Sequence, residues 1–201
     1  KRSERQMSKL FRAALLLIIL GSCASRDASA PRNLENACSI LTERPHYVRA
    51  FKQAERNWGV ETHVLMAMIY QESKFIANNR PPQTYALGII PTGRQSSALG
   101  YSQALDGTWE EYVDQQGGRR SNRTDIADAT DFMAWYMTAT VRENAIPLSD
   151  TYNQYLAYHD GRTGWRRGTY RSKPWLMRIA GEVSDRAALY DAQLQNCRQF
   201  R

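Results

Sequence analysis

Long hydrophobic runs, alternating strand patterns and clustered metal-binding residues are all scarce in this 201-residue chain. The longest apolar run, residues 13–20, is too short to span a bilayer, because a spanning helix needs roughly 20 apolar residues. The three cysteines and three histidines show no metal-ligand spacing, which argues against a structural zinc site. Alternation of apolar and polar residues is nearly absent, which argues against an all-β domain. What remains is one mostly helical domain without internal repeats.

The first residues of the sequence predict an export signal. Five basic residues precede the apolar run, which ends at Leu20-Gly21-Ser22-Cys23, an order typical of a signal peptide rather than of a buried helix. These four residues resemble the bacterial lipobox, in which the signal is removed before the cysteine and its sulfur carries a diacylglycerol. We therefore predict a signal peptide over residues 1–22 and lipidation of Cys23, with Met7 as a candidate initiator. A secreted protein with a free Cys23 is the alternative.

The charge balance argues against a nucleic-acid partner once the signal is set aside. The whole chain has 27 basic and 20 acidic residues, a net charge of +7. Residues 23–201 hold 22 basic and 19 acidic residues, a net charge of +3. The remaining basic residues gather in residues 161–171, where they are placed to meet an anionic polymer at close range.

The rest of the chain divides into a tether and a domain. Residues 23–37 include a stretch rich in Ser, Ala, Arg and Pro, which predicts a flexible tether after the lipidated cysteine. Residues 38–201 are long enough for one domain with a substantial core. Cys38 and Cys197 flank this domain in an exported chain, so we predict a disulfide between them; two buried thiols are the alternative.

Helical periodicity recurs through residues 38–201 and predicts an all-α domain. The expected helices cover residues 45–58, 61–73, 108–116, 125–142, 152–158 and 174–194, with Pro45 and Pro174 at helix starts. A small β-hairpin within residues 84–95 is the only strand pattern. Glu72 falls at the end of an apolar helix, where partial desolvation would raise its pKa toward that of a general acid. Taken alone, this position is more typical of an exposed helix-end glutamate.

Glu72 belongs to the first of three motifs that follow one another along the chain. They are Gln71-Glu72-Ser73-Lys74-Phe75, then Gly100-Tyr101-Ser102-Gln103, then Ala157-Tyr158-His159-Asp160-Gly161. In this order they resemble the Glu-Ser, Gly-Leu-Met-Gln and Ala-Tyr-Asn-Ala-Gly motifs of soluble lytic transglycosylases with a lysozyme-like SLT domain. The resemblance covers roughly residues 47–170 and is nearest to the transglycosylase lipoproteins of that family. It implies a goose-lysozyme-like helical domain of the α+β lysozyme superfamily, with a catalytic cleft.

The resemblance also implies roles for individual residues. Glu72 would be the sole catalytic carboxyl, Gln103 a substrate-binding amide, Tyr158 the hydroxyl that orients Glu72, and Ser73 a hydrogen-bonding group for the sugar or its lactyl group. A core aromatic, a loop amide and a helix C-terminal hydroxyl are the respective alternatives for Tyr158, Gln103 and Ser73.

The implied reaction cleaves the β-1,4 bond between N-acetylmuramic acid and N-acetylglucosamine and closes a 1,6-anhydromuramyl ring. One carboxyl acts in turn as acid and base, and neither water, metal nor organic cofactor takes part. The substrate's own N-acetyl group would replace the second carboxylate that many glycosidases use.

Two features depart from the family pattern. The insertion at residues 80–97 lengthens the interval between the first two motifs, and we expect it to form a lip over the cleft or an inert surface loop. Asp160 replaces the usual alanine, which leaves open a hydrolytic goose-type lysozyme in which Asp160 positions water. Its more ordinary role would be an ion pair with Arg162, Arg166 or Arg167. His159 stands alone, so no metal site is expected there.

Aromatic rings suit a sugar polymer, because pyranose rings present flat C–H faces to them. Of several candidates, Tyr101 and Trp165 are expected to bind substrate, since both lie in glycine-bearing loops beside family motifs. The others are Tyr85, Trp109, Tyr155 and Tyr170, while Trp135 and Trp175 are expected in the core.

The expected partners are peptidoglycan glycan strands and, through Cys23, a membrane. Ala24 and Ser25 lack the aspartate that retains lipoproteins at the inner membrane in enteric bacteria, so we expect a monomer on the outer membrane, facing the periplasm. A protein machine of the envelope stays open as a further partner. The contrasting interpretation is a peptidoglycan-binding scaffold lipoprotein without catalysis, and retention of Glu72 argues against it.

Overall fold

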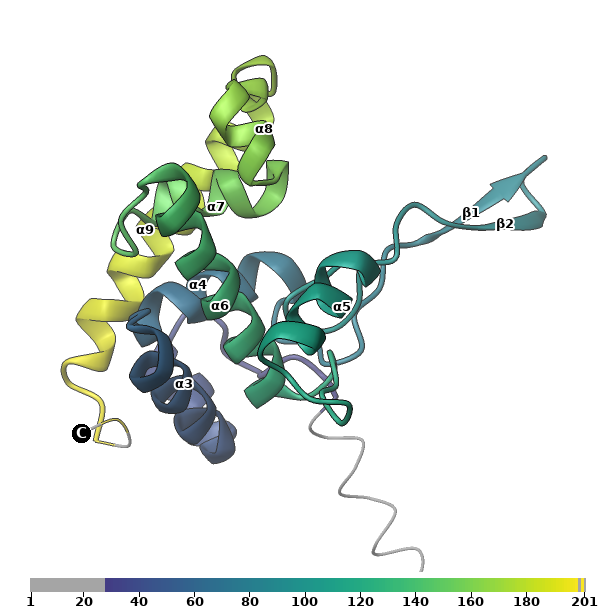
Figure 1. The fold of residues 1–201 in the computed structure, drawn as a ribbon. Helices are drawn as coiled ribbons and strands as arrows, with labels where there is room; N and C mark the ends of the chain where they lie inside the picture. The colour runs from purple at the N-terminus through teal and green to yellow at the C-terminus, as the bar shows by residue number, and fades with distance from the viewer. Residues whose placement is uncertain (1–27, 199, 201) are drawn as a thin grey trace, which may run out of the picture.

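The computed structural model describes residues 28–198 and residue 200, and within this part the chain is mostly helical (Figure 1). The elements in order are α2 (Ala37–Glu43), α3 (Pro45–Trp58), α4 (Thr62–Ser73), β1 (Gln83–Ala86), β2 (Ile90–Arg94), α5 (Asp106–Gln115), α6 (Ile126–Asn144), α7 (Thr151–Asp160), α8 (Arg162–Arg167), the 3₁₀ helix η1 (Thr169–Ser172) and α9 (Pro174–Leu194). The mostly helical fold predicted from the sequence is confirmed. The predicted signal peptide and Cys23 lie outside the described residues.

Local sequence explains where the helices begin and end. Pro45 opens α3, and Gly59 closes it in the left-handed conformation at φ 74°, a position that glycine adopts without steric strain. Asp125 caps α6 because its side chain accepts hydrogen bonds from the backbone N–H groups of Ala127 and Asp128.

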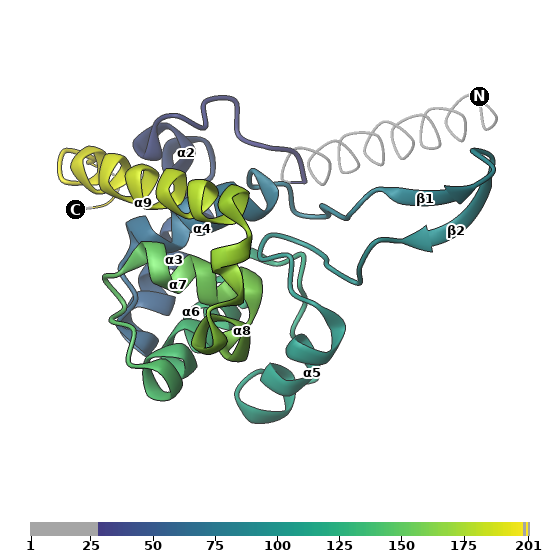
Figure 2. The ribbon, with the colours of Figure 1, turned by 90° about the horizontal axis from the view of Figure 1, so that it is seen from above.

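The core forms around α4. This helix is buried over most of its surface, from Val64 through Ile69, because α9 packs along one side and α3 along another. Figure 2 shows α9 crossing beside α4. A helix that is apolar all round is stable only when neighbouring helices cover it. The carboxyl end of α4, which carries Glu72, therefore lies next to the interior of the domain.

Residues 28–36, which the sequence analysis placed in the tether, contact the helical body. The Ala28 carbonyl accepts a hydrogen bond from Ala77 N at 3.1 Å, and the Leu34 carbonyl accepts one from the Tyr190 hydroxyl. Cys38 is joined to Cys197 by the predicted disulfide, which ties α2 to the segment after α9. Residues 28 and 34 of the predicted tether thus contact the domain.

The predicted hairpin is also present. Strands β1 and β2 pair antiparallel, with an irregularity in register between Thr84 and Tyr85. Both views show the hairpin projecting away from the helices (Figures 1 and 2). The strands pair with each other and not with the helical body, and whether the hairpin acts as a lip over the cleft or is an inert surface loop stays a prediction. Among residues 28–198, no helix has both the length and the apolar character needed to cross a bilayer.

Candidate active site

Glu72 lies in the last turn of α4 and is partly buried. Burial removes water from its carboxyl and raises the pKa from about 4.5 to about 7, although a hydrogen bond from Tyr155 and the positive charge of Lys74 act in the opposite direction. Desolvation therefore outweighs both stabilising contacts. A carboxyl with a pKa near neutrality can give and take a proton at physiological pH.

The backbone after Glu72 is held in an unusual conformation. Lys74 and Phe75 both have positive φ angles, 52° and 60°, which side chains with a Cβ rarely adopt. The Phe75 ring is buried and stacks on Tyr47 with ring centroids 6.0 Å apart, which holds this turn in place. Asn79 Nδ2 donates to the Glu72 carbonyl at 3.3 Å. These contacts hold the backbone around Glu72 and so fix the direction in which the Glu72 side chain extends from α4.

Two tyrosines of α7 face Glu72. Tyr155 and Tyr158 are three residues apart and so share one face of the helix. The Tyr155 hydroxyl hydrogen-bonds the Glu72 carboxyl, and burial together with the Glu72 charge raises its pKa well above the ordinary value. The Tyr158 pKa is raised by the same two causes, but its hydroxyl donates to the Ser102 carbonyl at 2.6 Å.

Of the two tyrosines, Tyr155 is the one that hydrogen-bonds Glu72, while the orienting role predicted for Tyr158 stays a prediction. The structure gives Tyr155 the contact with Glu72 that the family resemblance implied for Tyr158. The signal that could have identified Tyr155 is its spacing of three residues from Tyr158 on a helix.

The second motif forms a tight loop beside this site. Gly100 has φ 83°, and a Cβ at this position would lie 2.0 Å from the Arg123 carbonyl oxygen, so no larger residue fits. Gln103 Nε2 donates to the carbonyl oxygens of Gly100 at 2.8 Å and Asn79 at 3.0 Å. The Gln103 amide thus joins the loop to the segment that follows Glu72.

A cavity of about 280 Å³ lies between this loop and helices α5, α6 and α7. Gln103 and Tyr158 line it, together with Thr108, Phe132, Tyr136 and Asp160. Ser73, by contrast, is buried, and its Oγ donates to the Ile69 carbonyl at 3.2 Å. This is the helix C-terminal role rather than the predicted contact with a sugar.

Tyr101 is placed in the core and not on a surface that could meet a sugar. It is 3% exposed, its ring packs edge-on against Tyr47, and the two hydroxyl groups are 3.0 Å apart. Trp165 remains partly exposed on α8, where its Nε1 donates to Asn153 at 3.0 Å and its ring stacks near Tyr170. Of the two predicted sugar platforms, only Trp165 has an accessible ring.

Asp160 is engaged by two donors. Its side chain is 4% exposed and accepts hydrogen bonds from Lys173 Nζ and Thr169 Oγ1. Burial raises the Asp160 pKa, but these hydrogen bonds and the Lys173 charge outweigh burial, so the net pKa lies below the ordinary value. The expected arginine partners are replaced by Lys173, while Arg162 pairs with Glu143 at 2.9 Å.

A comparison with known families decides the assignment. The family model described as a transglycosylase SLT domain matches residues 11–197. The chain belongs to the transglycosylase SLT domain family. Among curated proteins, none matches the chain. Membership confirms the family resemblance, assigns the helical body to the lysozyme-like SLT fold and indicates a transglycosylase that acts on peptidoglycan in the cell envelope.

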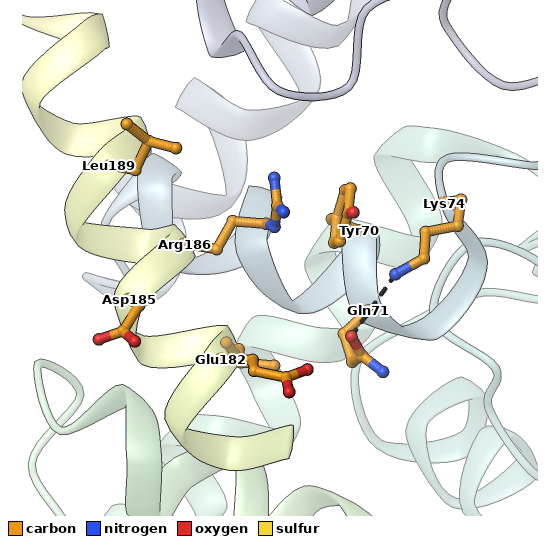
Figure 3. A pocket seen from close by; sticks show the side chains of 8 residues that line it. Tyr70, Gln71, Lys74, Glu182, Asp185, Arg186 and Leu189 are labelled. Atoms are coloured by element: carbon orange, nitrogen blue, oxygen red, sulfur yellow. Dashed lines mark hydrogen bonds between the residues drawn. The ribbon is translucent and has the colours of Figure 1, made fainter. Parts of the chain in front are cut away.

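The SLT domain has a second cavity on the other side of the α4 end, between α4 and α9 (Figure 3). It measures about 390 Å³. Tyr70 lies between two cations there, with Lys74 Nζ 3.7 Å and the Arg186 guanidinium 3.5 Å from the ring centroid. Arg186 also binds Glu35 through both guanidinium nitrogens. Burial and the nearby Arg186 charge lower the Lys74 pKa.

The importance of this cavity for the SLT site is electrostatic. The Lys74 ammonium lies close enough to Glu72 to lower the pKa of the Glu72 carboxyl.

In the described part of the chain, no group of three His, Cys, Asp or Glu side chains is arranged to hold a metal ion.

Proposed function

We propose that this SLT domain cleaves the β-1,4 bond between N-acetylmuramic acid and N-acetylglucosamine as a lytic transglycosylase, leaving a 1,6-anhydromuramyl end. The observation that carries the proposal is the carboxyl of Glu72, partly buried at the end of α4 with a pKa of about 7 and contacted by Tyr155. At pH 7 such a group is about half protonated, so it can start the reaction as an acid and finish it as a base.

The protons and bonds balance with Glu72 alone. The protonated carboxyl gives its proton to the glycosidic oxygen, and the bond from that oxygen to C1 of the muramyl residue breaks. The resulting carboxylate takes the proton of the C6 hydroxyl as O6 forms a bond to C1. Glu72 is protonated again at the end, and no water is consumed. The substrate's N-acetyl group would stabilise the positive charge that develops at C1.

Tyr155 supports both steps. Its hydroxyl donates to the carboxylate, which keeps the carboxyl in one orientation and limits the rise of its pKa. Without this hydrogen bond the pKa of Glu72 would rise further, so the carboxyl would stay protonated to a higher pH and would give up its proton less readily. Tyr155 is a positioning residue in this scheme, and Glu72 is the catalytic residue.

The contacts of Asp160 favour ring closure over hydrolysis. Hydrolytic enzymes of this type use a second carboxylate to activate or hold water. Asp160 is bound to Lys173 and Thr169 instead, with little of its side chain exposed. Gln103 and Trp165 remain the proposed substrate contacts, because the first lines the cavity beside Tyr158 and the second keeps an accessible ring.

Mass spectrometry of the products tests the reaction. Protein lacking residues 1–22 should release muropeptides with 1,6-anhydromuramyl ends from purified sacculi. Glu72→Gln should abolish release while binding to sacculi persists, and Glu110→Gln, at an exposed position on α5, should behave as the wild type. Products heavier by one water would instead identify a hydrolase, and the absence of products would identify a scaffold.

We also propose that the domain is anchored through Cys23 to the outer membrane and faces the periplasm. The lipobox-like residues before Cys23 support this. Incorporation of labelled palmitate should occur in the wild type and disappear in Cys23→Ala, and a wild type that takes up no label would contradict the anchor.

A further inference from the structure

The β1–β2 hairpin carries large apolar side chains that are exposed to solvent in the described part of the chain. Leu87 is 90% exposed and Ile89 79%, and Tyr85 and Ile90 are each 53% exposed. The other exposed large apolar residues, Leu105, Trp175 and Leu189, lie singly at distant points of the helical body. A concentration of exposed apolar residues at one point marks a surface that meets a partner.

The base of the hairpin is held, so the tip cannot simply fold back onto the helices. Asn79 O accepts a hydrogen bond from Gly100 N at 2.9 Å, which closes the two ends of the insertion. Beyond that point, Ser97 O accepts a hydrogen bond from Arg123 at 3.2 Å. The hairpin therefore stands clear of the body, as Figures 1 and 2 show.

The hairpin carries different kinds of residue at different distances from its turn. The tip carries Leu87, Ile89 and Ile90, the next pair is Tyr85 with Pro91, and the last pair is Gln83 with Arg94. At roughly 3.3 Å per residue, the four steps from Ile90 to Arg94 along β2 place Arg94 on the order of 13 Å from the start of that strand. One leaflet of a bilayer has a hydrocarbon depth of about 15 Å. A tip that lies among the acyl chains of one leaflet would therefore leave Arg94 within reach of the lipid phosphates.

The charge of the insertion favours an anionic surface. Residues 80–97 contain Arg80 and Arg94 and no acidic residue. Arginines near an apolar tip can reach lipid phosphates while the tip lies among acyl chains.

A protein partner fits these observations less well. Three aliphatic side chains and a tyrosine offer much less than the ~800 Å² per partner of a stable interface. Strand addition is disfavoured as well, because the strands are short, β2 contains Pro91, and the register is irregular at Thr84 and Tyr85. A bilayer requires neither a matched shape nor a regular strand edge.

We propose that the hairpin tip inserts into an anionic lipid bilayer, with Leu87, Ile89 and Ile90 among the acyl chains and Arg80 and Arg94 at the phosphates. Insertion would fix the orientation of the SLT cleft relative to the membrane. The inference does not depend on the proposed reaction or on lipidation of Cys23, because it rests on the exposed residues and their layering alone.

A fluorescent label at the tip tests the proposal. The full chain is prepared with Cys23→Ser, which removes the lipid site and leaves the Cys38–Cys197 disulfide intact. Ala86→Cys then carries an environment-sensitive dye beside the tip, and Asp114→Cys carries it on the exposed face of α5 as a matched control. Both are mixed with vesicles of phosphatidylethanolamine and phosphatidylglycerol, and with phosphatidylcholine vesicles for comparison.

We expect the dye at position 86 to brighten several-fold with anionic vesicles and to be quenched by lipids with brominated acyl chains. The dye at position 114 should do neither. If the chain binds vesicles through residues 1–27 alone, the dye at position 86 will stay in water, and this result overturns the proposal. Absence of binding overturns it as well.

A double variant adds a second measurement. Leu87→Asp with Ile89→Asp alters exposed residues, so the fold and the activity on soluble glycan fragments should be retained, whereas vesicle affinity of the Cys23→Ser chain should fall at least tenfold. Sedimentation without lipid distinguishes the competing partner: self-association of the parent chain that the double variant loses, with no vesicle binding, would identify a second copy and refute the membrane role.

Discussion

Replacing Glu72 with glutamine should stabilise the folded protein at alkaline pH. The carboxyl has a pKa of about 7 in the folded state and about 4.5 when solvated. The folded state therefore holds this proton more tightly than the unfolded state does. Its contribution to stability is complete below pH 4.5 and is lost as the pH rises through 7. Glutamine has a similar shape and never ionises, so the variant escapes this loss.

The magnitude follows from the two pKa values. One pH unit of difference in pKa corresponds to about 1.4 kcal/mol, so the interval from 4.5 to about 7 is worth about 3 kcal/mol in the free energy of unfolding at pH 8. For a domain of this size, 1 kcal/mol changes the Tm by about 2–4 °C. We expect Glu72→Gln to melt about 6–12 °C higher than the wild type at pH 8 and close to it at pH 4.

Urea titrations and thermal melts at pH 4 and pH 8 measure the effect. Glu110→Gln is the matched control, because Glu110 is exposed on α5 and loses no buried charge when replaced. The variants should share one m-value in urea, which shows that they expose the same surface on unfolding. Equal stability of Glu72→Gln and the wild type at pH 8 would refute the claim that this carboxyl is desolvated, and with it the basis of the acid step.

Two further predictions concern contacts of the same domain. Tyr155→Phe removes a hydrogen bond that lowers the pKa of the catalytic carboxyl, so the alkaline limb of kcat/KM against pH should move up by about one pH unit; Tyr85→Phe, on the hairpin, should leave the limb in place. Loss of the Cys38–Cys197 disulfide, by Cys38→Ala with Cys197→Ala, should lower the unfolding free energy by up to about 5 kcal/mol in urea titrations, because the bond closes a loop with a sequence separation of 159. An alkaline limb of kcat/KM that does not move in Tyr155→Phe would contradict the hydrogen bond to Glu72. A double alanine variant as stable as the wild type would contradict the stabilising role of the disulfide.

Several features of the domain were predictable because they depend on neighbouring residues. Apolar residues at helical spacing predicted most of the helices, and the apolar residues between glycine and proline in residues 84–95 predicted the hairpin. The order of the three motifs identified Glu72 and the family. The disulfide followed from the positions of Cys38 and Cys197 in an exported chain.

The details of the site depended on contacts between distant segments. Tyr155 and Tyr158 share one face of α7, and only the packing of α7 against the helices around α4 decides which hydroxyl reaches Glu72. Asp160 is 13 residues from Lys173, and the path of α8 and η1 brings the two together. Tyr101 is adjacent to a glycine, as a surface loop residue often is, yet its ring fills space beside Tyr47.

The sequence by itself therefore determined the helical class and the family, and it predicted Glu72 as the acid. Only the tertiary structure decided the partners of Glu72 and Asp160 and the outward direction of the hairpin. The physical reason is that periodicity and capping act over a few residues along the chain. Desolvation, hydrogen bonding and exposure depend on which segments surround a side chain in space.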